Sequence, residues 1–363
     1  AIEGVWKQSG VTIPLTLVPE VLSEAAAGRT QDPTPPFPYQ SLEVGFPGGD
    51  PGYQLAGTLT LPAGAGPFPA VLLVNGSGQQ NRDSEIFGHR PFLVIADALT
   101  RSGFAVLRYD DQGIGGSGGD PTEATTFDFA RDAASALSFL ARQDTIDSSR
   151  IGIIGHSEGG LIASILAADA EKNHLSWAVL LATSGVPGTE LLAAQNRAIG
   201  KAYNLSSQQL DYAELLNRNL YAIAVSDAPY HVRRDAIVTE LVKGGAARKN
   251  AEQSAETLLI PWMVTFLRTD PADYLNRVSI PVLALNGTMD LQVPWEQNLA
   301  AIGAALEKGG SRFVTESLPG LNHLFQPAVT GLPDEYGEIE ITFDPTTLAG
   351  IVTWAAEQSM LPQ

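Results

Sequence analysis

Residues 155–159 read Gly-His-Ser-Glu-Gly and place one serine between two glycines. The apolar run 151–154 before them is typical of a buried strand, and a small-residue helical pattern starts at 160–163. A serine in such a strand-turn-helix has its hydroxyl exposed above the sheet, and the flanking glycines let the backbone pass without a clash. Ser157 is therefore the predicted nucleophile. His156 is expected to pack beside it rather than act as the base.

A serine nucleophile needs a base to take its proton and a carboxylate to orient that base. Of the five histidines, His323 lies in a C-terminal loop straight after the strand-like run 312–315, so it is the predicted base. Asp290 follows the apolar run 281–285, at the strand end where open α/β sheets bind ligands. Asp290 is the predicted acid, with Asp270 as an alternative.

The predicted reaction also needs hydrogen-bond donors for an oxyanion. One is the backbone N–H of Glu158, directly after the nucleophile. The second is expected from the loop after the apolar run 71–74, at the N–H of Ser77 or, next, of Gly76. A phosphate-binding loop is the alternative interpretation, but no G-K-[ST] sequence follows.

The runs 104–108 and 177–181 do not alternate between apolar and polar residues. This pattern predicts strands that are buried on both faces, as in a parallel sheet. Residues 127–143 repeat apolar side chains at helical spacing, which predicts a crossover helix. Segments 42–46 and 53–61 flank a Gly/Pro-rich turn and predict an antiparallel edge hairpin. The fold class is therefore α/β, with a mostly parallel central sheet and helices on both faces.

Residues 188–270 interrupt this pattern late in the sheet and are partly helical and amphipathic, with Ser206 as a candidate N-cap. We expect a helical lid there, between the core segments 41–187 and 271–363. Near its end, Trp262 and Phe266 could form the wall of a substrate pocket together with Asn75 and Gly76. Packing between lid and core is the alternative role for the two aromatic residues.

Residues 1–40 carry two strand-like stretches and a proline-rich stretch at 32–38 that resembles an extended linker. They are interpreted as a strand and linker segment, the remnant of a separate domain. The sequence begins at Ala1 without methionine, which is expected of a processed or trimmed form.

The 363 residues contain 44% apolar residues and no cysteine, which excludes disulfides and a thiol nucleophile and fits an exported, periplasmic or secreted bacterial protein. A formal charge of −18 argues against nucleic acid and anionic membrane surfaces as partners. No segment is long and apolar enough to span a membrane. The sequence contains no cofactor-binding motif and no residues at metal-ligand spacing. We therefore expect neither a cofactor nor a metal ion.

Five motifs taken together resemble the bacterial α/β-hydrolase esterases of the serine aminopeptidase-like or dienelactone hydrolase-like groups, which include EstD-type carboxylesterases. They are the pentapeptide around Ser157 and residues 75–83, 108–117, 285–294 and 319–326. The resemblance covers about residues 40 to 360 and implies an α/β-hydrolase fold with Ser157, Asp290 and His323 as the triad.

Four residues depart from the usual family pattern. Asn75, Gln79 and Asn81 replace a histidine, a proline and an aspartate, and Gln112 stands where arginine is usual. These departures leave the triad positions intact and bear on the polarity of the acyl pocket.

The sequence thus predicts a serine hydrolase that cleaves small-molecule carboxylic esters through an acyl-enzyme. The alternatives are an aminopeptidase, another amidase or a thioesterase on the same scaffold. A catalytically dead binding module is a further alternative, which the filled triad positions disfavour.

Overall fold

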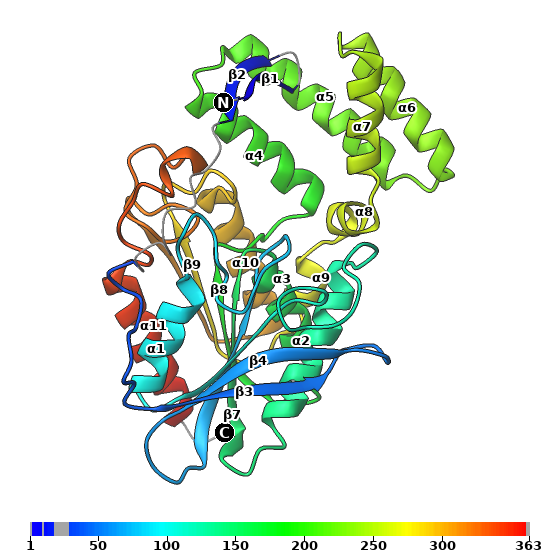
Figure 1. Cartoon of the computed structure of the whole chain (residues 1–363). Coiled ribbons are helices and arrows are strands. Elements are labelled where there is room, and N and C mark those ends of the chain that lie inside the picture. The colour runs from blue at the N-terminus through cyan, green and yellow to red at the C-terminus, as the bar shows by residue number, and fades with distance from the viewer. Residues whose placement is uncertain (1, 9–10, 18–28, 361–363) are drawn as a thin grey trace.

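The computed structural model describes residues 2–8, 11–17 and 29–360 (Figure 1). Within these residues, eight strands form a central sheet in the order β10-β9-β8-β7-β5-β6-β4-β3. The strands are β3 (Gln40–Pro47), β4 (Gln54–Leu61), β5 (Phe68–Val74), β6 (Ala105–Tyr109), β7 (Ile146–His156), β8 (Leu175–Leu181), β9 (Val282–Gly287) and β10 (Phe313–Leu318). All neighbours from β6 to β10 pair in parallel, whereas β4 is antiparallel to both β6 and β3. The predicted, mostly parallel sheet with an antiparallel edge hairpin is confirmed.

Alternate residues of the inner strands bury their side chains on opposite faces of the sheet. In β5, Leu72 belongs to the apolar cluster of one face, while Val71 and Leu73 belong to that of the other. Because both faces are covered, these strands need apolar residues at every position, which explains the continuous apolar runs in the sequence.

Helices cover the sheet on both sides, as predicted (Figure 1). One face packs against α1 (Pro91–Arg101) and α11 (Pro345–Met360). The other packs against α2 (Thr126–Leu140), α3 (Glu158–Ala167), α9 (Ala272–Leu275) and α10 (Trp295–Gly309). A short 3-10 helix, η1 (Pro333–Glu335), lies in the loop before α11.

The chain between β8 and β9 forms a separate helical layer beyond the carboxyl ends of the strands (Figure 1). Its helices are α4 (Gly188–Ala202), α5 (Ser207–Val225), α6 (Tyr230–Lys243), α7 (Arg248–Leu258) and α8 (Pro261–Arg268). They share an apolar cluster of their own, which includes Leu220, Ala224 and Ile237. The predicted helical insertion is confirmed, and Ser206 caps α5 by accepting from Gln209 N at 3.4 Å. We call residues 188–268 the lid.

The first strands, β1 (Ile2–Gln8) and β2 (Val11–Leu17), pair antiparallel in a two-stranded sheet, so the strand-like stretches predicted there are confirmed. Residues 1, 9–10 and 18–28 of the predicted N-terminal segment lie outside the described residues. The proline-rich stretch 32–38 has no helix or strand, and just before it Gln31 Oε1 accepts from Thr342 N at 2.6 Å. The separate N-terminal domain stays a prediction.

Candidate active site

Ser157 occupies the turn between β7 and α3 with φ 55° and ψ −118°. A positive φ is costly for a residue with a side chain, and it persists only where surrounding bonds impose it. Here Ser157 N donates to Leu181 O at 2.8 Å, and Thr183 Oγ1 donates to Ser157 O at 2.9 Å. The neighbouring strand β8 and the loop after it therefore hold the serine in its strained turn, in the geometry of a nucleophile elbow.

The two glycines of the motif are required by backbone packing. A Cβ on Gly155 would lie 2.0 Å from Gly159 O, and one on Gly159 would lie 2.1 Å from Val74 O. Both distances are far below van der Waals contact, so no side chain fits at either position. The spacing seen in the sequence is thus explained by the close approach of α3 to β7 and β5.

His323 and Asp290 form a buried hydrogen-bonded pair. His323 Nδ1 lies 2.8 Å from Asp290 Oδ2, and the two residues are 5% and 3% exposed. The other carboxylate oxygen, Oδ1, accepts from the backbone N–H groups of Gln292 at 2.8 Å and Val293 at 2.9 Å. The loop after β9 thus fixes the carboxylate, and the carboxylate orients the ring that follows β10.

Asp270, the alternative acid, has a different role in the structure. Its Oδ1 accepts from Ala272 N at 2.9 Å, at the start of α9. This bond to the residue two positions further on is that of an Asx-turn just before α9, whose N-cap is Pro271. Of the two candidate acids, the structure brings Asp290 to His323.

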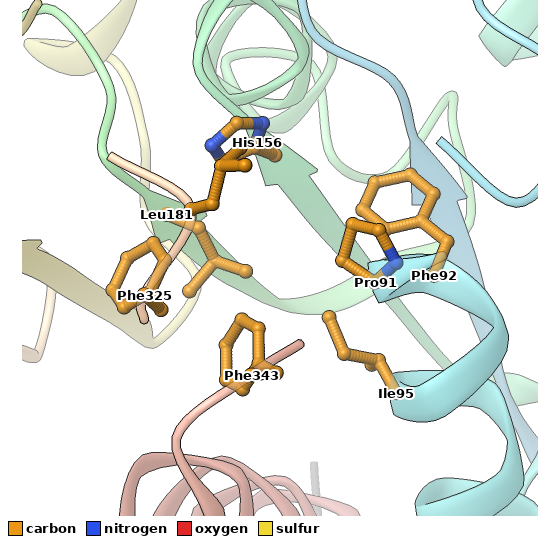
Figure 2. Close-up of a pocket in the computed structure, with 8 residues that line it drawn as sticks. Pro91, Phe92, Ile95, His156, Leu181, Phe325 and Phe343 are labelled. Carbon is orange, nitrogen blue, oxygen red and sulfur yellow. The ribbon is translucent and has the colours of Figure 1, made fainter. Parts of the chain in front are cut away.

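His156 contacts His323 through a hydrogen bond and through ring packing. Its Nε2 donates to the carbonyl oxygen of His323 at 2.9 Å, and the two ring centroids are 4.7 Å apart. Burial lowers the pKa of His156 to about 3, so this ring stays neutral and carries no charge into the site. Beyond it lies a small apolar cavity of about 10 Å³ on the α1 side of the sheet, where Leu181 and Phe325 are among the wall residues (Figure 2).

The loop after β5 runs against the elbow, as the predicted oxyanion site requires. A Cβ on Gly76 would lie 3.2 Å from Ser157 Cβ, so the loop passes close to the serine with little space between them. Ser77 follows on the exposed side of the same loop. Glu158, whose N–H is the other predicted donor, directly follows Ser157 and is the first residue of helix α3. The choice of the individual donors stays a prediction.

The side chain of Glu158 connects the elbow to the lid. Glu158 is 5% exposed, and its Oε1 and Oε2 accept from Trp262 Nε1 at 2.8 and 3.0 Å. Thr126 Oγ1 donates to Oε1 at 2.6 Å, and burial raises the pKa of the carboxyl group. Trp262 in turn stacks on Phe266, with ring centroids 5.6 Å apart. Trp262 of α8 therefore contacts Glu158, the residue after the predicted nucleophile, and Phe266 packs against Trp262.

Two acidic side chains near Ser157 were missed in the sequence. Only the backbone of Glu158 was considered there, and Asp111 was not singled out. Asp111 is 8% exposed and binds Asn75 Nδ2 through Oδ1 at 3.2 Å. Burial raises the pKa of Asp111 to about 7. The signal available was a pair of aspartates, Asp110 and Asp111, directly after a buried strand.

Asn75 lies below the loop surface rather than in its rim. It is 5% exposed, and its Nδ2 also donates to Asn81 O at 3.2 Å. Two of the residues that depart from the usual family pattern therefore contact each other. With Gly76, Asp111 and Glu158, Asn75 borders a small cavity beneath the loop.

Within the described residues, no cluster of three or more His, Asp or Glu could hold a metal ion. No helix in the described part of the chain is long and apolar enough to cross a membrane.

Comparison with known proteins gives relatives along most of the chain. Esterase EstD of Thermotoga maritima is 29% identical over 243 residues, which are 66% of this chain and 50% of EstD. An uncharacterised 31.7 kDa protein of Escherichia coli is 24% identical over 254 residues, 69% of this chain and 82% of that protein. This chain thus spans about half the length of EstD.

Solved structures resemble the fold at low sequence identity. Proline iminopeptidase of Mycobacterium smegmatis superposes with a TM-score of 0.54 at 15% identity, over 88% of this chain and 99% of that one. Est1E of Butyrivibrio proteoclasticus with bound ferulic acid gives a TM-score of 0.50 at 18% identity, over 87% and 98%. These likenesses concern the fold alone.

Residues 69–320 match the family described as the alpha/beta hydrolase fold. This match includes the elbow, the lid and the loop of Asp290, and the sheet order and crossover helices agree with it. The chain belongs to the α/β hydrolase fold family.

Proposed function

We propose that this protein is a serine hydrolase that cleaves carboxylic esters through an acyl-enzyme. The observation that carries the proposal is the buried Asp290–His323 pair, 2.8 Å apart, whose histidine is bonded at its carbonyl oxygen by His156, the residue before Ser157 in the strained turn. This arrangement of acid, base and nucleophile fits acyl transfer, because it can activate a hydroxyl that is otherwise a poor nucleophile.

In the proposed reaction, His323 takes the proton of Ser157 as Oγ attacks the ester carbonyl carbon. Asp290 keeps the imidazole in the required tautomer and stabilises its protonated form. The oxyanion accepts from the backbone N–H of Glu158 and from that of Ser77 or Gly76. When the acyl–oxygen bond breaks, His323 gives its proton to the leaving alcohol. Water, deprotonated by His323, then attacks the acyl-enzyme and releases the acid.

An ester as substrate is supported by the similarity to EstD, the relative that is named an esterase. Substrate choice is proposed to lie in the lid, where Trp262 and Phe266 reach the elbow through the carboxyl of Glu158. Asn75 and Gly76 form the opposite side of the proposed pocket, on the loop after β5.

A fluorophosphonate probe tests the proposal, because it reacts with an activated serine and mimics the first covalent step. We expect one equivalent of label, located by peptide mass spectrometry on Ser157, with loss of ester hydrolysis in the same proportion. Ser164→Ala serves as the matched control, since Ser164 lies in α3 and its Oγ donates to Gly160 O at 2.8 Å. Labelling of another residue, or labelling that leaves ester hydrolysis intact, would overturn the proposal.

A further inference from the structure

A second polar feature lies beneath the loop after β5, in a small cavity with a volume of about 10 Å³, which leaves room for one water-sized group such as an ammonium head. Its polar wall consists of Asn75, Asp111 and Glu158, with the ring of Tyr109 beside them. Gly76 also borders the cavity, and Glu158 directly follows Ser157. The cavity therefore lies next to the position where the proposed reaction places the acyl group, and no lysine, arginine or histidine is among the residues that line it.

Asn75 presents an unpaired acceptor there. Its Nδ2 donates to two acceptors, Asn81 O and Asp111 Oδ1, both at 3.2 Å, which fixes the orientation of the amide. The remaining atom, Oδ1, is buried and has no partner among the described residues. A buried acceptor without a donor is costly to the folded protein. The amide is therefore suited to a ligand that donates a hydrogen bond.

The two carboxyl groups add acceptors and negative charge. Asp111 Oδ2 accepts from Gln80 N at 3.0 Å, and Glu158 accepts from Thr126 and Trp262. A carboxylate has about four acceptor positions, so both groups keep unused ones. Burial raises the pKa of both groups, and the nearby Glu158 carboxyl raises the pKa of Asp111 further. A cation placed between them would favour the ionised forms of both.

We propose that this cavity binds a primary ammonium group on the acyl part of the substrate. Three N–H donors of an ammonium match three acceptors, namely Asn75 Oδ1 and one oxygen each of Asp111 and Glu158. The inference rests on the proposed ester hydrolysis, and it narrows the substrate class to esters of short amino acids. The cavity lies close to the proposed nucleophile, because Gly76 borders it and a Cβ added to Gly76 would lie 3.2 Å from Ser157 Cβ.

The test uses pairs of ethyl esters in which –NH₃⁺ replaces –CH₃ of the same chain. Ethyl β-alaninate is paired with ethyl butanoate, and ethyl 4-aminobutanoate with ethyl pentanoate, at pH 7.5, where an alkylamine stays protonated. The measured quantity is the ratio of kcat/KM within each pair, divided by the same ratio for hydrolysis by hydroxide. This normalisation removes the intrinsic reactivity of each ester.

For the wild-type protein we expect a normalised ratio of about 10 to 100 for at least one pair, as for a hydrogen-bonded charge. Asp111→Asn, which keeps the shape and removes the charge, should lower that ratio about tenfold or more. The matched control is Asp132→Asn. Asp132 is also a buried carboxyl, 1% exposed, but it bonds Tyr53 and Gly49 outside the cavity, so the ratio should stay at the wild-type value.

Propylammonium chloride provides a second measurement that needs no variant. It should inhibit ethyl butanoate hydrolysis competitively, whereas potassium chloride at equal ionic strength should not. Equal effects of the two salts would mean that the cavity takes an inorganic cation and would overturn the proposal. A wild-type ratio near one for both pairs would overturn it as well, because the cavity would then hold only water.

These outcomes are separate from failure of the proposed function. If neither alkyl nor amino esters are hydrolysed and the fluorophosphonate does not label Ser157, the ester hydrolase proposal fails. If alkyl esters are hydrolysed with Ser157 as nucleophile but without preference for the ammonium group, only the cavity assignment fails.

Discussion

The carboxyl edge of the sheet and the lid are built in different ways. At the edge, buried side chains are held by several bonds each, as Asp290 is by His323, Gln292 and Val293. In the lid, charged contacts lie at the surface, such as that of Arg197 with Asp211 at 2.9 Å. Exposed pairs of this kind contribute only about 0–1 kcal/mol, so the lid depends on its apolar cluster.

The two regions meet through hydrogen bonds and through apolar packing, and Tyr203 of the lid donates to Asp334 at 3.0 Å. Trp262 bonds Glu158, and Phe266 packs with Leu161 and Val293 in a small apolar cluster. The difference indicates that the two regions have different roles. The sheet edge fixes the positions of the proposed catalytic groups, and the lid determines which substrates reach them. Each of the following predictions tests this division.

The largest effect is expected at the nucleophile. Ser157→Ala should lower ester hydrolysis by at least about a thousandfold, because the attacking oxygen is lost, while the melting temperature stays near that of the wild type. Kinetics on ester substrates and thermal unfolding measure the two effects. Ser164→Ala controls for the loss of a serine in the adjacent helix. Activity above roughly a tenth of wild type, in a preparation free of other esterases, would contradict the role of Ser157.

The acid comes next. Asp290→Asn should lower kcat by on the order of a thousandfold, since an amide at this position favours the wrong tautomer of His323. Asp270→Asn is the matched control and should change kcat far less, because the Asp270 carboxylate bonds the backbone N–H of Ala272 rather than His323. Steady-state kinetics on both variants decide between them. If Asp270→Asn lowered kcat more than Asp290→Asn, the catalytic acid would be Asp270 at the boundary of the lid. The catalytic groups would then not all belong to the sheet edge.

Lid variants should change selectivity more than rate. Replacing both Trp262 and Phe266 by alanine should reorder kcat/KM among short-acyl, long-acyl and aryl esters by about 1–3 kcal/mol per lost pocket contact. Trp262→Phe keeps an aromatic ring and removes only the N–H donor to Glu158, so it separates packing from the hydrogen bond. An equal loss for every ester would show that the two rings only fasten the lid.

The last effect concerns the dependence of stability on pH rather than the rate of the reaction. Burial raises the pKa of Asp111 from 3.8 to about 7, so between these values the folded protein binds one more proton than the unfolded chain. The free energy of unfolding should therefore fall as the pH rises through this range, by up to about 1.4 kcal/mol per pH unit from this group. Denaturant unfolding from pH 4.5 to 7 should show a smaller decline for Asp111→Asn. Glu123→Gln, at an exposed position, controls for the loss of one charge. If the free energy of unfolding fell with pH at the same rate in the wild type and in Asp111→Asn, ionisation of Asp111 would not be the cause of the decline.

The sheet, the turn around Ser157 and the helical insertion could be predicted because they depend on short-range patterns. Continuous apolar runs specify strands covered on both faces, and the two glycines around Ser157 occur where an added Cβ would lie 2.0 or 2.1 Å from a backbone oxygen. The position of Asp290 also follows from a local rule, since ligand-facing residues sit at the carboxyl ends of parallel strands.

Contacts between distant side chains could not be predicted in this way. The bond from Trp262 to Glu158 joins residues 104 positions apart, and it depends on how α8 returns to the sheet. The raised pKa of Asp111 depends on burial by the loop after β5, which the sequence does not show. Aromatic residues at helical spacing favoured packing between lid and core over a pocket wall without deciding between them, and only the packed fold brings Trp262 to Glu158.

The bond between Glu158 and Trp262 bears on how such a protein could be redesigned. A lid transplanted from a relative would bring its own residue opposite Glu158, and without an N–H donor there the carboxyl would keep only Thr126 as a side-chain donor. A buried carboxyl deprived of a donor costs about 1–3 kcal/mol, enough to favour chimeras whose lid stands away from the elbow. Lid and elbow should therefore be exchanged together, with position 158 matched to the donor that the incoming helix supplies.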